Sequence, residues 1–330
     1  VNRHYPEGMT VYDPAMGSGS LLLNFKKYAK KYNIKPEEII YYGQEINLST
    51  FNLAKMNMIL HGVDANNQHL RNGDTLDEDW PPIQETMFDS VVMNPPYSYH
   101  WSANKGFLED PRFSKFGVLP PKSKADYAFL LHGLYHLKNS GTMAIVLPHG
   151  VLFRGGSEGK IRQKLLDSGI IDAVIGLPAN LFYNTSIPTC ILVLKKDKQD
   201  RDVMFIDASK EFEKGKNQNK LKEENITKIL DTYKKCEDVK RYAHLAKFDE
   251  IKKNDFNLNI PRYVDTFVPE PPVDLKKVSA DLRKTDDEIQ KNQTELVGML
   301  KDLTSNDPKI MDGLNDIIKT LNYGRIECYY

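Results

Sequence analysis

The sequence lacks the features that mark membrane, secreted and zinc-binding proteins. No apolar run approaches the roughly 18 residues that span a bilayer, and the first residues have no signal-peptide architecture. The three cysteines, Cys190, Cys236 and Cys328, are far apart and form no CxxC pair, and the histidines show no HExxH spacing. These absences argue against a zinc site or a disulfide framework. We therefore expect a cytoplasmic protein and assign no metal.

A net charge is also missing. Lys plus Arg and Asp plus Glu both total 45 among 330 residues, so the formal net charge at pH 7 is zero. A neutral chain exerts no strong overall attraction on a polyanion such as nucleic acid. A nucleic-acid substrate would therefore need help from another protein to stay bound.

What the sequence does contain is an alternation of short β-branched runs with longer amphipathic stretches. Such alternation predicts a mainly parallel sheet with helices on both faces. Strands are expected at residues 10–12, 39–43, 68–71, 88–93, 143–147, 171–176 and 189–194. Helices are expected at residues 21–32, 49–61, 124–138, 158–168 and 221–235.

The last two of these strands should pair antiparallel. The connection between residues 176 and 189 holds no helical stretch long enough for the crossover that a parallel pair needs. A parallel sheet that ends in an antiparallel hairpin is typical of the Rossmann-like class I S-adenosylmethionine-dependent methyltransferases. We expect this α/β catalytic domain to occupy residues 1–207.

Two further regions are expected after residue 207. Residues 208–272 are polar and rich in Lys and Glu, which indicates a peripheral subdomain or linker. In residues 273–330, apolar side chains recur at seven-residue intervals, at Leu275, Leu282, Ile289, Leu296 and Leu303. A second apolar helix is expected after Pro308. This coiled-coil-like pattern fits a helical hairpin that packs on its own chain, and it equally fits a docking element for a partner.

A glycine-rich segment lies between the first predicted strand and helix. The glycines allow a tight turn and close backbone approach to a ligand. A dehydrogenase would need a third small residue where Leu22 stands, and Asp13 would repel a diphosphate. S-adenosylmethionine carries a sulfonium and an ammonium but no phosphate, so an acid before a helix start suits it. We predict that its binding residues include Asp13, Pro14, Gly17, Ser18, Gly19 and Ser20.

Two more acidic residues follow the next two strands. Glu45 comes at the end of the second strand, where a carboxylate can accept both ribose hydroxyls of the cofactor. Asp74 follows the third strand and can bind the cofactor's adenine amine. Each acid taken singly fits a solvated loop equally well. Three acids at successive strand ends, in order, favour a cofactor site.

The apolar strand at residues 88–93 runs directly into Asn94, Pro95, Pro96 and Tyr97. An amine on a base ring is a poor nucleophile because its lone pair is delocalised. The Asn94 side-chain carbonyl and the Pro95 main-chain carbonyl can accept its two N–H bonds and direct the lone pair at a methyl group. Tyr97 offers a ring for stacking on a flipped base. We predict these four residues as catalytic; the alternative is a proline-rich turn after a buried strand.

The loop that follows this strip is rich in aromatic and basic residues. Such a composition suits a surface that faces nucleic acid, and a loop anchored to the core by its aromatic rings explains it as well. The aromatic residues are Tyr99, Trp101, Phe107, Phe113 and Phe116, and the basic ones are Lys105, Arg112, Lys115, Lys122 and Lys124. Farther along, His132 and His149 are interpreted as structural rather than catalytic.

With both motifs in place, the sequence resembles the modification subunits of type I restriction-modification systems, which are N6-adenine DNA methyltransferases. Beyond the two motifs, the resemblance rests on KADYAF at 124–129, GTMAIVLPHG at 141–150 and LPANLF at 177–182. It implies that Ser18 to Ser20 and Glu45 contact S-adenosylmethionine. It also implies that Asn94 to Tyr97 contact the target adenine and that Phe182 lies near the edge of the base.

The resemblance further implies double-stranded DNA, a specificity subunit that reads its sequence, a second modification subunit and an optional restriction subunit as partners. A specificity subunit would account for the neutral charge, and residues 273–330 would then dock it. The family carries a helical domain before the Asp-Pro loop, but only twelve residues precede Asp13, so we expect a fragment without that domain. Two rivals stay open: methylation of protein glutamine or an RNA base by the same chemistry, and a non-catalytic scaffold that binds the specificity subunit.

Overall fold

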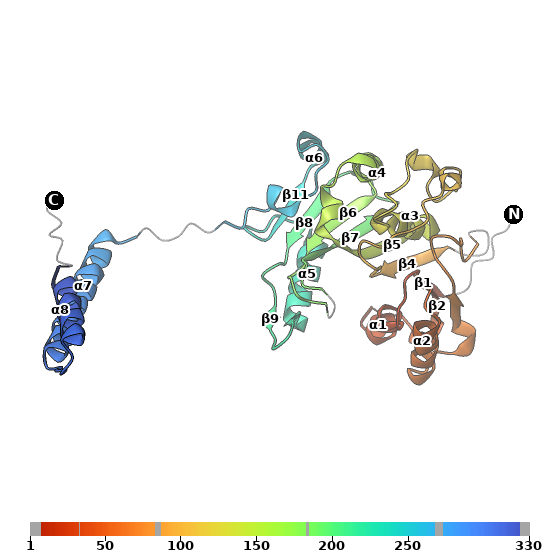
Figure 1. Cartoon of the computed structure of the whole chain (residues 1–330). Coiled ribbons are helices and arrows are strands. Elements are labelled where there is room, and N and C mark those ends of the chain that lie inside the picture. Colours follow the sequence, from red (N-terminus) through yellow and green to blue (C-terminus); the bar gives the residue numbers. More distant parts are fainter. Residues whose placement is uncertain (1–7, 33, 83–86, 183–184, 268–272, 324–330) are drawn as a thin grey trace. The chain divides into compact units, whose positions relative to one another are not determined.

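The computed structural model describes residues 8–32, 34–82, 87–182, 185–267 and 273–323. The chain divides into two compact units, one that ends at Phe267 and one that starts at Val268. The first unit is an α/β structure built on one large twisted sheet, and the second is a pair of helices (Figure 1). Among the described residues, no helix combines the length and the apolarity that crossing a bilayer requires.

The large sheet of the first unit holds nine strands among the described residues. In spatial order they are β11 (Ala243–Ala246), β8 (Val203–Asp207), β6 (Ile171–Gly176), β7 (Thr189–Lys195), β5 (Leu137–Pro148), β4 (Phe88–Met93), β1 (Met9–Asp13), β2 (Ile39–Glu45) and β3 (Gln68–Asn72). The strands from β5 to β3 pair in parallel, whereas β7 is antiparallel to both β5 and β6. The expected mainly parallel sheet and its antiparallel pair are confirmed.

The antiparallel pair does not end the sheet, however. Strand β8 pairs in parallel with β6, and β11 pairs antiparallel with β8 to form the edge. The side chains of residues 248–264 also pack into the same core, where the Tyr263 ring stacks on the Phe205 ring with centroids 3.9 Å apart. The boundary expected at residue 207 therefore falls inside this unit, and residues 208–267 belong to it.

Helices cover both faces of the sheet (Figure 1). Because successive residues of a strand point to opposite faces, Val11 packs in one core cluster and Tyr12 in another. The face of Val11 carries α1 (Ser20–Ala29) and α2 (Leu48–Leu60), and the face of Tyr12 carries α3 (Asp126–His136) and α4 (Gly156–Asp167). Two more helices, α5 (Glu223–Lys235) and α6 (Phe248–Lys253), cover the end of the sheet that β8 and β11 form.

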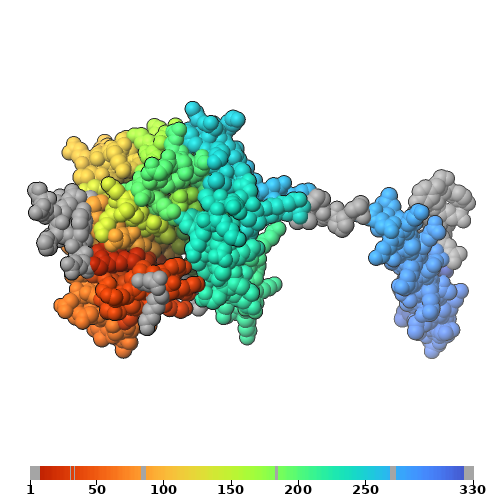
Figure 2. Space-filling model, turned by 180° about the vertical axis from the view of Figure 1, so that it is seen from behind, coloured from red at the N-terminus to blue at the C-terminus, as the bar shows by residue number. Residues whose placement is uncertain are grey.

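Helices far apart in the sequence meet on one side of this unit. The rear view shows the red α1 beside the blue-green segment that includes α5 (Figure 2). The Tyr28 hydroxyl of α1 donates to Glu223 Oε1 of α5 at 3.2 Å, and the Lys234 ammonium lies 5.5 Å from the centre of the Tyr32 ring. The first and last thirds of the unit are therefore in direct contact.

The largest difference between the expected and the observed ends of an element concerns α3 and β5. The expected helix over residues 124–138 ends at His136, and β5 starts at Leu137, six residues before the expected strand. The polar run Asn139-Ser140-Gly141 suggests a loop, but it lies within the strand. A Cβ on Gly141 would stand 2.8 Å from the Phe88 carbonyl oxygen, so glycine lets β5 run close to β4 at this irregular point of their pairing.

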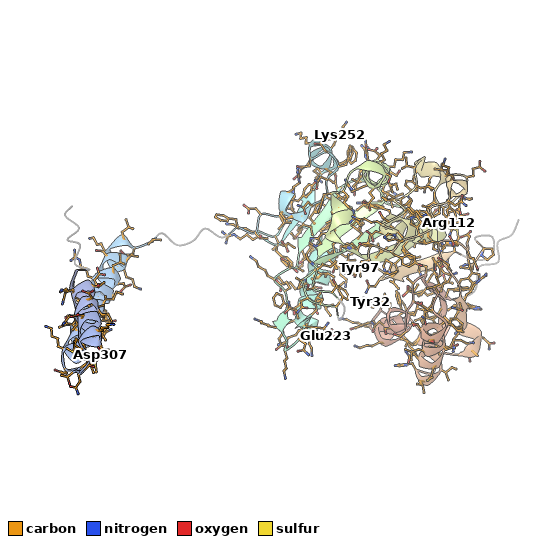
Figure 3. All side chains as sticks on the ribbon, viewed as in Figure 1. Tyr32, Tyr97, Arg112, Glu223, Lys252 and Asp307 are labelled. Atoms are coloured by element: carbon orange, nitrogen blue, oxygen red, sulfur yellow. The ribbon has the colours of Figure 1, made fainter. Side chains whose placement is uncertain are left out.

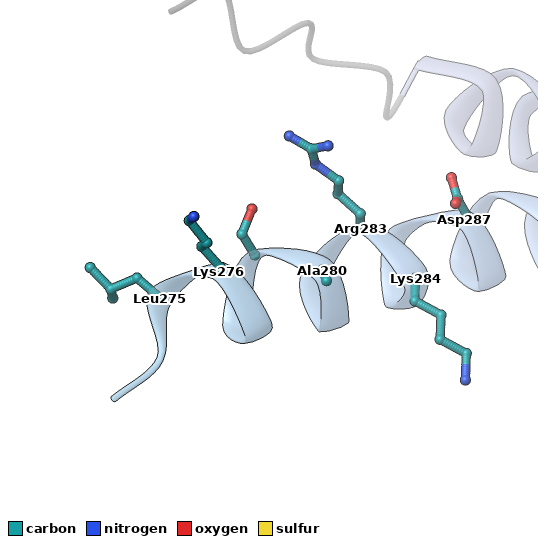
Figure 4. Close-up of a pocket in the computed structure, with 7 residues that line it drawn as sticks. Leu275, Lys276, Ala280, Arg283, Lys284 and Asp287 are labelled. Atoms are coloured by element: carbon teal, nitrogen blue, oxygen red, sulfur yellow. The ribbon is translucent and has the colours of Figure 1, made fainter. Parts of the chain in front are cut away.

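The second unit is an antiparallel pair of helices, α7 (Leu275–Lys301) and α8 (Pro308–Tyr323). Of its heptad residues, Leu275 is 77% exposed and Leu282 is 60% exposed, and the other three are exposed as well. The buried residue of α7 is Val297, which lies outside the heptad series. Helix α7 ends before Leu303 and Pro308, so the proline starts α8 rather than interrupting one long helix. Figure 4 shows a shallow hollow on α7 that is lined only by residues of α7 itself, Leu275, Lys276, Ser279, Ala280, Arg283, Lys284 and Asp287.

Candidate active site

A cavity of about 410 Å³ opens at the carboxyl ends of β1, β2, β3 and β4. Ligands of open α/β sheets bind at this edge. The cavity is lined by Pro14, Ala15, Gly17, Gln44, Glu45, Ile46, Gly73, Asp74, Thr75, Asn94, Pro96, Tyr99 and Phe129. The structure thus brings residues of the glycine-rich loop, both later acids, and Asn94 and Pro96 of the Asn-Pro-Pro-Tyr strip to one site. The other predicted cofactor-binding and catalytic residues do not line the cavity: Asp13, Ser18, Gly19, Ser20, Pro95 and Tyr97.

The glycine-rich loop is fixed to the end of β2. The Gly17 N–H donates to Glu45 Oε2 at 3.1 Å, and the Met16 N–H donates to the Gln44 carbonyl oxygen at 3.0 Å. Gly17 and Gly19 have φ values of +53° and +80°, in the left-handed region that favours glycine. Ser18 and Ser20 share a hydrogen bond of 3.0 Å at the start of α1. The loop therefore presents its main chain, rather than large side chains, to the cavity.

Asp13 is buried below this loop. Its Oδ1 accepts the Ala15 N–H at 3.0 Å, but its Oδ2 has no hydrogen-bond partner in the structure. Burial raises the pKa of Asp13 from 3.8 to about 8; the Ala15 N–H opposes this shift and the Glu45 carboxylate adds to it. A buried carboxyl group with a free oxygen is costly, so its presence at this position suggests that it serves ligand binding.

Asp13→Asn is expected to stabilise the chain without ligand above about pH 4. A carboxyl whose pKa is raised in the folded state binds its proton more tightly there, so the unfolded chain gains from ionisation as pH rises from about 4 to about 8. Asparagine keeps the Oδ1 acceptor but does not ionise. The free energy of unfolding of the variant should therefore exceed that of wild type by up to a few kcal/mol at pH 8 and by almost nothing near pH 3. Urea unfolding at both pH values measures this difference in stability. An equal difference at the two pH values would contradict the raised pKa assigned to Asp13.

The Asn-Pro-Pro-Tyr strip follows β4 at the mouth of the cavity. Asn94 is exposed, and its Oδ1 accepts the Tyr97 hydroxyl at 2.7 Å. Burial raises the pKa of Tyr97 above its usual value, and Cys190 and Asp126 add to this effect, so the hydroxyl keeps its proton and can donate. The Phe182 ring meets the Tyr97 ring edge to face, with centroids 6.4 Å apart. Phe182 therefore lies beside the strip.

A buried polar network that sequence reasoning missed supports this site. Arg112 is 2% exposed and binds both carboxylate oxygens of Asp110. It also donates to the main-chain carbonyls of Thr75 and Leu76 at 3.0 and 3.1 Å. The Thr75 hydroxyl donates in turn to the Pro14 carbonyl. Arg112 thereby holds the chain after β3, which lines the cavity, against the glycine-rich loop.

The network continues through His132. Burial lowers the pKa of His132 well below its usual value, and His136 and Arg112 add to the effect, so the ring is neutral. With Arg112 donating to Nδ1 at 3.2 Å, the Nε2–H is left to donate to the Tyr12 hydroxyl at 2.9 Å. That hydroxyl donates to the Trp80 carbonyl at 2.8 Å. His132 is therefore structural, as is His149, whose Nε2 bonds the Thr189 carbonyl at 3.0 Å.

Burial also decides between the two interpretations of the aromatic and basic loop. Trp101, Phe113, Phe116 and Arg112 are buried, so they anchor the loop to the core and do not face a nucleic acid. Only the lysines at 105, 115 and 122 are exposed. The rings pack beneath the loop, with Trp101 and Phe107 centroids 5.4 Å apart, so the interpretation as a loop anchored to the core accounts for them, and only the exposed lysines could face a nucleic acid.

Asp79, His132 and His136 form a cluster whose ligand atoms lie within 4.8 Å of one another. Both nitrogens of His132 already have partners, and His136 Nε2 lies 2.8 Å from Asp79 Oδ1. The Arg112 guanidinium lies 4.0 Å from Asp79, so a metal cation would have to compete with a fixed positive charge. The cluster fits a structural hydrogen-bond network and does not fit a metal site.

Comparison with known proteins places this site in a family. A family model described as N-6 DNA Methylase matches residues 3–270. The methylase subunit of the type I restriction enzyme MpnII from Mycoplasma pneumoniae is 42% identical over 302 residues, which cover 89% of this chain and 54% of that protein. The corresponding MjaVII subunit from Methanocaldococcus jannaschii is 37% identical over 300 residues, 87% of this chain and 50% of that protein. The chain thus spans about half the length of these relatives.

A solved structure agrees. The methyltransferase subunit of a type I restriction-modification system from Streptococcus thermophilus is 64% identical and superimposes with a TM-score of 0.76, over 80% of this chain and 56% of that one. The shared sheet, with one antiparallel strand between parallel neighbours, is the class I methyltransferase fold. From the family match, the sequence identity and the common fold together, the chain belongs to the N-6 DNA methylase family.

Proposed function

We propose that this chain is the catalytic part of a type I restriction-modification modification subunit. In this proposal it transfers a methyl group from S-adenosylmethionine to N6 of a flipped adenine in DNA, as a site-specific, adenine-specific enzyme of the cytoplasm. The observation that carries the proposal is the convergence of Asn94, Glu45 and Asp74 on one cavity at the sheet edge. The relatives named above are subunits of such systems.

The residues around the cavity fit S-adenosylmethionine. Asp13 Oδ2 and Gln44 Nε2 are buried polar atoms without partners in the structure. Asp13 would hold the ammonium group, Glu45 the ribose hydroxyls and Asp74 the adenine amine. Glu45 already accepts the Gly17 and Asn47 N–H groups, yet each of its oxygens keeps a second lone pair. When bound, this cofactor supplies an electrophilic methyl group on a sulfonium.

Asn94 and Pro95 would activate the target amine. The Asn94 Oδ1 and the Pro95 main-chain oxygen accept the two N6–H bonds, which draws the nitrogen out of conjugation with the ring and turns its lone pair toward the methyl carbon. After methylation the nitrogen would carry one extra proton, which these two acceptors would hold by hydrogen bonds until it passes to water, because a neutral amide oxygen is too weak a base to keep it. The Tyr97 ring would stack on the flipped base, and Phe182, whose ring meets the Tyr97 ring, would lie near the edge of the base.

Tyr97→Phe is expected to lower the kcat of methyl transfer about fivefold while the KM for DNA changes little. Phenylalanine keeps the stacking ring but loses the hydroxyl that donates to Asn94 Oδ1, a bond that fixes which end of the amide faces the amine. A neutral hydrogen bond of this kind contributes about 1 kcal/mol. Steady-state kinetics with Tyr97→Ala alongside separates the two roles. An unchanged kcat for Tyr97→Phe would contradict the positioning role, and a fall as large as that of Tyr97→Ala would contradict the stacking role of the ring.

Labelled S-adenosylmethionine tests the proposed activity against its rivals. The chain is incubated in parallel with duplex DNA, with RNA and with a protein of a class that accepts methyl groups on glutamine. The labelled product is then identified after digestion. N6-methyladenine in DNA supports the proposal, whereas label only in RNA or protein refutes it. Co-expression with a specificity subunit, followed by mapping of methylated adenines in the host genome, extends the test to the assembled complex.

The helical unit supports the second part of the proposal, an assembly with other subunits. We propose that α7 and α8 dock the specificity subunit, together with a second modification subunit and, optionally, a restriction subunit. The support is the large exposed apolar area of this pair, in which Leu275, Leu282 and Ile289 stand open on α7. The scaffold alternative predicts that the wild-type chain assembles with its partners but transfers no methyl group. The Asn94 variant described below, which should keep assembly and lose methyl transfer, separates the two activities.

A further inference from the structure

A lysine-rich ribbon adjoins the proposed site and has no role in it so far. The ribbon, defined here as residues 210–222, contains the short antiparallel strands β9 (Glu213–Lys214) and β10 (Asn219–Lys220). The Gly215 N–H donates to the Gln218 carbonyl at 3.0 Å and closes the turn. A Cβ on Gly215 would stand 2.3 Å from that carbonyl oxygen, so this tight turn depends on glycine. The ribbon is therefore a defined element with Lys216 and Asn217 at its tip.

Four hydrogen bonds tie the ribbon to the segment that carries Phe182. The main-chain N–H and the side-chain amide of Asn219 donate to the Asn180 and Ala179 carbonyls at 2.9 and 2.8 Å. The Asn180 amide donates to the Asn217 carbonyl at 3.2 Å, and Gln218 Nε2 donates to the Leu181 carbonyl at 3.4 Å. Since Phe182 lies against Tyr97, the ribbon is held at the base-facing edge of the site.

The ribbon concentrates positive charge in a chain whose formal net charge is zero. It has five lysines and two glutamates, a net charge of +3 within thirteen residues. Glu211 pairs with Lys228, and Glu213 pairs with Lys222. Within the described part of the chain, no ion pair is found for the other ribbon lysines, all of which are exposed: Lys210, Lys214, Lys216 and Lys220. Their charge is available to a partner.

The pairing of the two strands says which lysines face the site. Lys214 lies opposite Asn219, and directly paired residues point to the same side of a ribbon. Asn219 binds the Ala179 carbonyl with its side chain, so Lys214 shares the face that meets the Phe182 segment. Lys220 lies on the other face, opposite Glu213. Lys214 and the tip residue Lys216 are thus the two unpaired charges best placed beside the base.

Taking the proposed function as given, we propose that Lys214 and Lys216 bind phosphates of the DNA strand that carries the flipped adenine. A base can leave the stack only if the backbone on either side is held, and lysines provide such contacts without reading sequence. The local positive charge of the ribbon also explains how a chain of zero net charge can hold DNA at this point. In Figure 1 β9 extends from the α/β unit beside α5, and in Figure 3 Glu223, which follows the ribbon, lies below Tyr97.

The test compares Lys214→Gln/Lys216→Gln with wild type in DNA binding as a function of salt. Each lost phosphate contact should make the plot of log K against log salt shallower by about 0.9, hence by about 1.8 for the pair. Binding at roughly 0.1 M salt should be about tenfold to a hundredfold weaker. In methyl transfer, the KM for DNA should rise by a similar factor while kcat at saturating DNA holds.

Lys252→Gln/Lys253→Gln is the matched control, because both lysines are exposed on α6, at the other end of the unit from Glu223 in Figure 3, and the change in charge is the same. The proposal is overturned if the ribbon variant and this control have the same salt dependence and the same KM. It is also overturned if the wild-type chain binds no duplex at low salt, or if only assembly with a protein partner weakens. A wild-type chain that methylates no DNA adenine would instead refute the proposed function.

Discussion

Asn94→Ala is expected to lower the rate of methyl transfer to DNA by about a hundredfold to a thousandfold, the loss found when one fixed hydrogen-bonding group is removed from a transition state. The amide oxygen of Asn94 is one of two acceptors available to the target amine at the end of β4. Without it the nitrogen lone pair stays conjugated with the ring. Because Asn94 is exposed, the free energy of unfolding should change by no more than about 1 kcal/mol.

Asn94→Asp is the informative companion to the alanine variant, because aspartate keeps an oxygen acceptor at the same position. Single-turnover measurements should place it between wild type and Asn94→Ala. Cofactor affinity and assembly with partners should persist in both variants, since neither change touches Glu45, Asp74 or the helices α7 and α8. Unchanged DNA methylation by the alanine variant would remove Asn94 from the mechanism.

Arg112→Met is expected to have the largest effect on stability, a loss of about 3–5 kcal/mol, because removing one member of a buried ion pair leaves the other uncompensated. Methionine fills similar space but donates no hydrogen bond. The Thr75 and Leu76 carbonyls and His132 Nδ1 would lose this donor, and the Asp110 carboxylate would keep only the main-chain N–H of residue 112. Urea unfolding of the whole chain measures this loss.

Lys115→Met serves as the control for Arg112→Met, since it removes a positive charge from the same loop at an exposed position. Its stability should lie within about 0.5 kcal/mol of wild type. Arg112→Lys should recover part of the loss but not the paired contacts to Asp110, because lysine lacks the fork of donors. Similar losses for the two methionine variants would show that Arg112 does not hold the loop.

Much of the fold followed from local patterns. The expected strands at residues 39–43 and 88–93 correspond to β2 and β4, since β-branched and aromatic runs between turn residues specify a strand within a few residues. The glycine-rich loop and the Asn-Pro-Pro-Tyr strip could be placed at the sheet edge because each directly follows a strand. The site's position, therefore, depended on short-range information that one sequence carries.

Other parts of the site depend on contacts between distant residues, which leave no local pattern. In sequence, Arg112 looks like Lys105 and Lys115, and only the packing of Phe113 and α3 around it makes it buried. The ribbon reads as polar linker, yet Asn219 is bonded to residues about forty positions earlier. The polar segment that includes β11 likewise gives no sign that it completes the sheet.

The antiparallel course of β7 has a consequence for how proteins of this kind can diversify. Because β6 and β7 are antiparallel neighbours, the connection between them begins and ends at the same end of the strand pair. There Gly176 is paired with Cys190, and the Leu177 N–H donates to the Thr189 carbonyl at 2.8 Å. Residues can be inserted or lost between these closed ends without shifting the register of either strand. A segment that lies beside the Asn-Pro-Pro-Tyr strip can therefore change in length during evolution while the hydrophobic core retains its packing.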